Sequence, residues 1–217
     1  MNFVGHIATG VAVDGSRDDV EFLLGTALPD FAAMARLRLD RTAALGLESS
    51  LGSGMQLHHE TDAIFHRQGW FLGLEHDLLD ELIAAGVPRG GALACAHVGV
   101  ELLLDGELLR APETSAAVLD VYGAMGSPPA VVLDVVDPTQ RARWSEHLTG
   151  IAERLDPFLY SDANSVAQRL HRITSPRPRL AFEPEHIATV AALLSAVQPQ
   201  IAASAPDILA RVAAAVR

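Results

Sequence analysis

Apolar and polar residues follow the period of an α-helix over most of this chain, with apolar positions recurring every three or four residues. The segments with this period are residues 2–12, 18–39, 54–66, 70–86, 92–108, 111–125, 137–155, 161–173 and 185–217. We expect each of them to form a helix. The pattern therefore predicts an all-α protein, folded as a compact multi-helix bundle.

Several residues mark where these helices should begin, bend or end. Gly86 precedes a Val-Pro pair and is a usual helix stop, and Ser161 or Asp162 is a suitable N-terminal cap. Pro29 should interrupt or bend the second helix. The β-branched stretch 128–138 is bounded by prolines, so we expect a connector or a short helix there rather than a strand.

Length and composition favour one domain over residues 1–217. A chain of this length buries a sizeable core, its 49% hydrophobic content suits packed helices, and its 5% aromatic content is low for a sheet-rich protein. The polar motifs described below lie within about 1–110, and C-terminal helices occupy about 111–217.

Charge and cysteine content narrow the partners and the compartment. The net charge is -11 and no basic run is present, which argues against nucleic-acid binding and disfavours an acidic macromolecular partner, although not a small anion. The single cysteine, Cys95, forms no intrachain disulfide and is expected to serve in packing. We find neither a convincing signal peptide nor an uncharged apolar run of membrane-spanning length. We therefore expect a cytoplasmic protein without a membrane partner.

Two segments carry metal-capable side chains at four-residue spacing. "GMQLHHETDAIFH" contains His58 and Asp62, and "ALACAHVGVELLLDGEL" contains His97 and Glu101. Residues four apart lie one turn apart on the same helix face. If the two helices face each other, two imidazoles and two carboxylates meet, a set that suits Mn, Fe or Zn rather than Ca.

The next polar residues in these series, His66 and Asp105, lie roughly 80° around the helix and are weaker candidates. Apolar residues surround Glu101, and a buried carboxylate without compensation costs several kcal/mol. A cation is the simplest compensation. A hydrogen bond to His97 or a salt bridge to an arginine is the alternative.

Two more residues are candidates by their surroundings. His6 lies in an apolar N-terminal helix, where an ordinary core histidine is the alternative interpretation. Asp30 follows Pro29 inside an apolar stretch, where a helix cap is the alternative.

In chain order, "MNFVGH", "LLGTALPDF", "GMQLHHETD" and "HVGVE" resemble the motifs of the acyl carrier protein phosphodiesterase family. The enzymes of that family look like distant, all-α relatives of the HD-domain metal-dependent phosphohydrolases. The resemblance covers residues 1–105 and continues weakly to about 180. His6, Asp30, His58 and Asp62 match family motif positions. The chain departs from the family at His97-x-x-x-Glu101, where the family has two aspartates, and in the insertion 38–53.

The resemblance implies an HD-domain-like fold and a metal-dependent phosphoester hydrolase, either a phosphodiesterase or a phosphatase, that uses metal-activated water. One or two divalent transition metal ions are expected, with Mn indicated by the resemblance and Fe or Zn as alternatives. The expected ligands are His6, Asp30, His58, Asp62, His97 and Glu101, and His97 is alternatively a residue behind the ligands. Asp62 would bridge two ions. His59 would orient water or the leaving group, unless it is simply exposed.

The resemblance also bears on the substrate. Arg169, Arg172 and Arg177 are candidates for binding substrate phosphate, with ordinary surface charge as the alternative. We expect a small phosphorylated substrate, because acyl carrier protein is itself acidic and a chain of this charge repels it. The main rival function is a non-catalytic metal-binding or interaction module. The His76-Asp77 dipeptide matches the His-Asp signature of HD-domain enzymes, but a match of two residues is close to chance. It lies on an acid-rich segment that we expect to be a solvent-exposed helix face.

Overall fold

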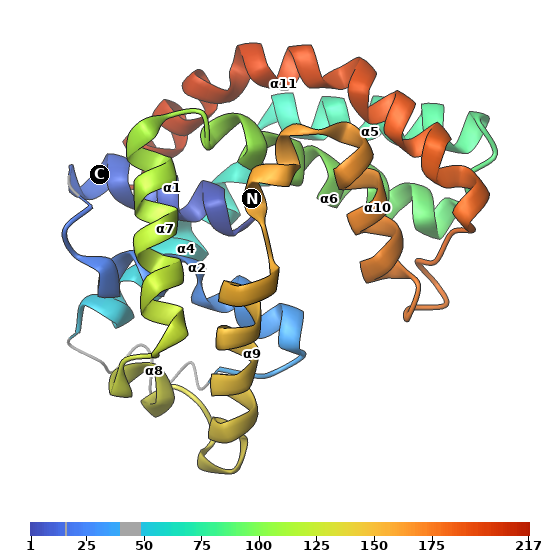
Figure 1. Cartoon of the computed structure of the whole chain (residues 1–217). Coiled ribbons are helices and arrows are strands. Elements are labelled where there is room, and N and C mark those ends of the chain that lie inside the picture. Colours follow the sequence, from blue (N-terminus) through green and yellow to red (C-terminus); the bar gives the residue numbers. More distant parts are fainter. Residues whose placement is uncertain (16, 40–48) are drawn as a thin grey trace. The chain divides into compact units, whose positions relative to one another are not determined.

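The computed structural model describes residues 1–15, 17–39 and 49–217, and within these ranges the protein is all-α (Figure 1). The α-helices are α1 (Phe3–Asp14), α2 (Val20–Ala35), α4 (Ser50–Phe65), α5 (Gly69–Ala84), α6 (Arg89–Leu108), α7 (Pro112–Gly126), α8 (Ala130–Asp134), α9 (Arg141–Arg154), α10 (Ala163–Thr174) and α11 (Ile187–Ala215). Three short 3-10 helices are η1 (Pro138–Gln140), η2 (Pro157–Ser161) and η3 (Pro184–His186). The prediction of an all-α fold is confirmed, whereas the HD-domain-like arrangement stays a prediction.

The local signals explain most helix boundaries. After α5 the chain turns at Gly86, whose φ of 88° favours glycine, and Asp162 caps α10 by accepting hydrogen bonds from two backbone N–H groups. Pro29 lies inside α2 without interrupting it. The stretch 128–138 forms α8 and one isolated β-bridge, between Val136 and Leu39. The described ranges contain no β-strand. Much of the insertion expected to flank the site, residues 40–48, lies outside these ranges.

The chain divides into two compact units. Unit 1 comprises residues 1–64, 109–156 and 209–217, and unit 2 comprises residues 65–108 and 157–208. Each unit is described by itself below. The expectation of one domain over the whole chain stays a prediction.

In unit 1, α1 packs on α2 and α7 around an aromatic core. The rings of Phe3 and Phe31 lie 5.2 Å apart, and both side chains are fully buried. α2 and α4 cross in close contact at Gly25 and Gly54. The helices lie so close that a Cβ on either glycine would overlap a backbone carbonyl of the opposite helix. This crossing brings the polar residues of the two helices together.

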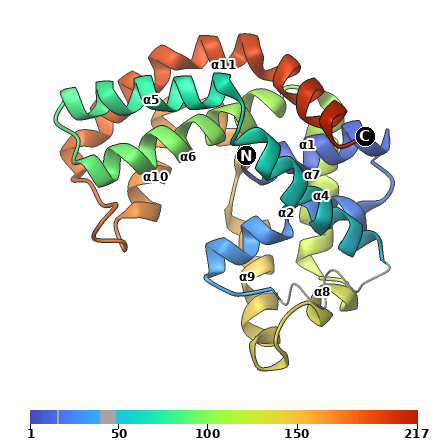
Figure 2. The ribbon, with the colours of Figure 1, turned by 180° about the vertical axis from the view of Figure 1, so that it is seen from behind.

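In unit 2, α6 packs on α5, α10 and η2, and Figure 2 shows α5 and α6 side by side. Gly99 and Gly106 allow this close packing: a Cβ at Gly99 would press on Leu194, and one at Gly106 would overlap the backbone at Tyr160. Because neighbours cover α6 on most sides, even its acidic residues Glu101 and Asp105 are buried.

α11 and the turn before it, residues 184–215, are long and apolar enough to cross a membrane by length and composition alone. A core helix passes the same test, and Val190, Leu194 and Ile201 of α11 are fully buried, although only 22% of the apolar 18-residue window is buried. The expectation of no membrane partner stays a prediction.

Candidate metal centres

Three candidate ligands from three helices meet in unit 1. His6 comes from α1, Asp30 from α2 and His58 from α4, and one ligand atom of each lies within 4.8 Å of the others. The two imidazole rings are 3.9 Å apart between centroids. We call this group the unit-1 centre. It contains three of the four motif residues that resemble the phosphodiesterase family, His6, Asp30 and His58, whose positions span 52 residues of the chain.

Hydrogen bonds to the protein assign the tautomers of both imidazoles. His58 Nδ1 lies 2.8 Å from the carbonyl oxygen of Thr26, which only accepts, so Nδ1 carries the proton and Nε2 keeps its lone pair. His6 Nδ1 lies 3.0 Å from Thr61 Oγ1. That hydroxyl donates its own proton to backbone carbonyls of α4 at 2.8 and 3.0 Å, so it accepts from His6. Nε2 of His6 therefore also has a lone pair, and it makes no hydrogen bond among the described residues.

Burial keeps both imidazoles neutral. It lowers the pKa of His6 well below the usual range, with a further contribution from the neighbouring His58. It lowers the pKa of His58 to about 4, although the hydrogen bond to Thr26 acts in the opposite direction. At neutral pH both Nε2 atoms are thus available as ligands. A buried histidine that presents a lone pair while its other nitrogen is held by the protein is the usual arrangement of a metal ligand.

Asp62 lies at the edge of this group, one turn after His58 on α4. Its Oδ1 is 3.8 Å from Nε2 of His6 and 3.3 Å from the amino group of Met1. Its side chain is 40% exposed, unlike the buried imidazoles. The predicted His-x-x-x-Asp pair of α4 therefore reaches the unit-1 centre with both members, and Asp62 is its solvent-facing carboxylate.

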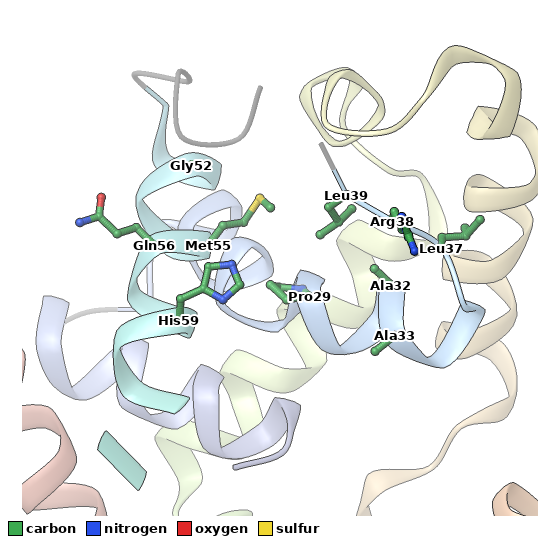
Figure 3. Close-up of a pocket in the computed structure, with 10 residues that line it drawn as sticks. All are labelled: Pro29, Ala32, Ala33, Leu37, Arg38, Leu39, Gly52, Met55, Gln56 and His59. Carbon is green, nitrogen blue, oxygen red and sulfur yellow. The ribbon is translucent and has the colours of Figure 1, made fainter. Parts of the chain in front are cut away.

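A cavity of about 320 Å³ lies beside this centre in unit 1 (Figure 3). Its walls are mostly apolar, and its polar residues are Arg38, Gln56 and His59. His59 projects from α4 toward Pro29 in Figure 3, and its ring meets that of His58 edge-on at 5.3 Å. His59 thus connects the cavity wall with a candidate ligand.

A second group of candidate ligands lies in unit 2. It combines the predicted pair His97 and Glu101 with His66, which helical spacing placed off the His58/Asp62 face of its own helix. His66, His97 and Glu101 each offer a ligand atom within 4.8 Å of the others. The sequence predicted that the pairs His58/Asp62 and His97/Glu101 face each other in one site. The structure shows one group that contains His58 in unit 1 and one that contains His97 and Glu101 in unit 2, and the single site stays a prediction. His66 follows the last turn of α4, where the periodic helix argument no longer applies. Glu75, which contacts His97, was not predicted either, although it borders the buried face of α5.

The three arginines proposed for substrate phosphate all lie in unit 2 and have different surroundings. Arg169 lies beside Tyr160: burial raises the pKa of Tyr160 to about 12, and the charge of Arg169 opposes this rise. Arg177 lines a second cavity, of about 380 Å³, together with His97. Arg172 is exposed on α10. Their role toward phosphate stays a prediction.

Cys95 and three histidines outside the two groups have ordinary structural surroundings. Cys95 is fully buried, and burial raises the pKa of its thiol to about 12. His147 and His171 each contact a backbone carbonyl, at 2.9 and 3.0 Å. His76, of the His-Asp dipeptide, is 73% exposed in its side chain.

Comparison with protein-family models, with curated proteins and with solved structures finds no match to this chain.

Proposed function

We propose that this protein is a metal-dependent phosphoester hydrolase whose metal is held in unit 1 by His6, Asp30, His58 and Asp62. The observation that carries the proposal is the pair of buried, neutral imidazoles that present Nε2 lone pairs beside a carboxylate. Such a mixed nitrogen and oxygen set suits Mn, Fe or Zn. The phosphoester class comes from the motifs that resemble the acyl carrier protein phosphodiesterase family, and an HD-domain-like arrangement is part of the same proposal.

The metal would polarise a phosphoryl oxygen and lower the pKa of bound water. The residues of this chain have separate tasks. Thr26 and Thr61 hold the two imidazoles in the tautomer and orientation that a ligand needs. Asp62 supplies a second carboxylate at the open edge of the centre, and His59 is within reach to orient water or the leaving group.

The cavity beside the centre indicates the kind of substrate. Its apolar walls suit a phosphoester with an apolar portion, and Arg38 supplies a positive charge. We propose a small phosphorylated molecule rather than acyl carrier protein, because the net charge of -11 repels an acidic protein.

The first experiment measures metal content and hydrolysis together. Metal-stripped protein is loaded with Mn, Fe or Zn and assayed on chromogenic phosphomonoesters and phosphodiesters. We expect Asp62→Asn and His58→Gln to lose most of the activity. Glu60→Gln is the matched control on α4, since Glu60 is exposed and accepts a hydrogen bond from Gln56, one turn earlier on the same helix. Equal activity in Asp62→Asn and Glu60→Gln would refute the role of Asp62. Metal binding without hydrolysis of either ester class would favour the non-catalytic metal-binding module.

A second variant tests the imidazole argument itself. Thr61→Val keeps the side-chain shape but removes the acceptor for His6 Nδ1–H, so metal affinity should fall about 10–100-fold. Thr9→Val is the control, because Thr9 is equally buried and its hydroxyl donates to the backbone carbonyl of Gly5 at 2.8 Å. If both variants bind metal as the wild type does, His6 is a core histidine and not a ligand.

A further inference from the structure

A second group of ligand-type atoms converges in unit 2. His66 Nε2 lies 3.1 Å from Glu101 Oε1 and 3.3 Å from His97 Nε2, and the third side of this triangle, from His97 Nε2 to Glu101 Oε1, is 3.6 Å. Two nitrogens and one oxygen thus surround one point.

A carboxylate behind His97 assigns its tautomer. His97 Nδ1 lies 2.9 Å from Glu75 Oε1, and an ionised carboxylate only accepts, so Nδ1 carries the proton. The lone pair of His97 is then on Nε2, the atom that faces the other two. A carboxylate that holds the far nitrogen of a histidine is a recurrent feature behind metal ligands.

Aromatic packing fixes the orientation of both imidazoles. The rings of His66 and His97 are parallel within 4°, with centroids 5.0 Å apart. The fully buried Phe71 meets each of them edge-on, at 5.4 and 5.3 Å. These contacts hold the two Nε2 atoms toward the same side, so the arrangement exists before anything binds.

We propose that His66, His97 and Glu101 form a second metal centre that binds a divalent first-row transition metal, with Glu75 as the positioning residue. Metal bonds of about 2.0–2.2 Å place neighbouring ligands about 2.8–3.6 Å apart, from octahedral to tetrahedral geometry. The sides of 3.1, 3.3 and 3.6 Å fall at this spacing. Two histidines and one carboxylate are a known set for such metals with positions left open.

The competing explanation is a proton in place of the metal. In that case His66 Nε2–H donates to Glu101, and the group is a hydrogen-bonded network. Under the competing explanation His97 Nε2, without a proton of its own, faces this shared N–H at 3.3 Å and the carboxylate oxygen of Glu101 at 3.6 Å.

Access to the group is open. The side chains of His66 and His97 are 30% and 38% exposed, whereas Glu101 is 10% exposed. His97 and Glu75 also line the cavity of about 380 Å³. An ion can therefore enter, and water or another small ligand can complete its coordination.

Co(II) titration of the metal-stripped full chain tests the proposal, with visible absorption and bound-metal analysis as readouts. The His58→Gln background removes the unit-1 centre from the count. We expect this variant to bind one Co(II) per chain and to lose it when His97→Gln is added. Adding His76→Gln instead is the matched control, because His76 is an exposed histidine of the same unit, and binding should persist.

The outcomes separate the two centres. If the wild type binds Co(II) but His58→Gln binds none, the second centre is refuted and the unit-1 centre stands. If His97→Gln alone abolishes binding and His58→Gln does not, the unit-1 proposal fails and the second centre stands. Equal binding by His58→Gln with and without His97→Gln also refutes the second centre.

Glu75→Gln provides a test that leaves all three ligands in place. Loss of the carboxylate behind His97 should weaken Co(II) binding in the His58→Gln background about 10–100-fold. Glu81→Gln, an exposed change on the same helix, should have no effect. Unchanged affinity in Glu75→Gln would show that the carboxylate positions no ligand, and circular dichroism checks that each variant folds.

Discussion

Acid should destabilise the metal-free protein over a defined pH range because of the unit-1 imidazoles. In the unfolded chain a histidine has a pKa near 6.5, whereas burial lowers the pKa of His58 to about 4 in the folded protein. As the pH falls below about 6.5 the unfolded state takes up a proton that the folded state does not. Stability is therefore fully present above pH 6.5 and is lost as the pH falls toward 4.

The magnitude follows from this pKa difference. A gap of about 2.5 units corresponds to about 3 kcal/mol for His58, of which about 2 kcal/mol falls between pH 7 and pH 5. His6 acts in the same direction, because burial lowers its pKa as well. Most carboxyl groups remain ionised above pH 5, so this interval isolates the histidines.

Urea unfolding of chelator-treated protein at pH 7 and pH 5, followed by circular dichroism, measures the effect. In His58→Gln the loss of stability between the two pH values should be smaller than in the wild type by about 2 kcal/mol. His76→Gln should behave as the wild type does, because its side chain is 73% exposed before unfolding. A His58→Gln protein with the full pH dependence of the wild type would refute the reasoning, since burial of His58 would then carry no proton-linked cost.

Two further predictions concern packing. Gly54→Ala should push α4 away from α2, cost about 1–3 kcal/mol of stability and lower metal binding at the unit-1 centre. Gly73→Ala, which has nothing within 4 Å of its added Cβ, should have none of these effects. Equal stability of the two variants in urea would contradict the close crossing. Burial raises the pKa of the Cys95 thiol from 9.0 to about 12. At pH 8 this thiol should therefore be alkylated about a thousandfold more slowly in native protein than in urea-unfolded protein, and mass spectrometry measures both rates. Fast labelling of the native protein would place Cys95 at an accessible position.

Sequence periodicity was sufficient for the fold class and for most helix boundaries, because apolar spacing and caps act within a few residues. Gly86 and Asp162 are at the turns where the pattern placed them. The pairs His58/Asp62 and His97/Glu101 were also predicted from spacing, since a helix puts residues four apart on one face.

Two residues at the group in unit 2 could not be found in this way. His66 lies just past the end of α4, where helical spacing no longer describes which residues are neighbours. Glu75 reaches His97 from another helix, and no local pattern indicates such a contact.

The sequence by itself determined that the protein is helical and which residue types were available for a metal. Only the tertiary structure decided their combination. The Gly25–Gly54 crossing brings α2 against α4, which places Thr26 beside His58, and the packing of α5 on α6 places Glu75 behind His97. These are contacts between helices distant in the chain, and their geometry depends on how whole helix faces pack, which local periodicity does not specify.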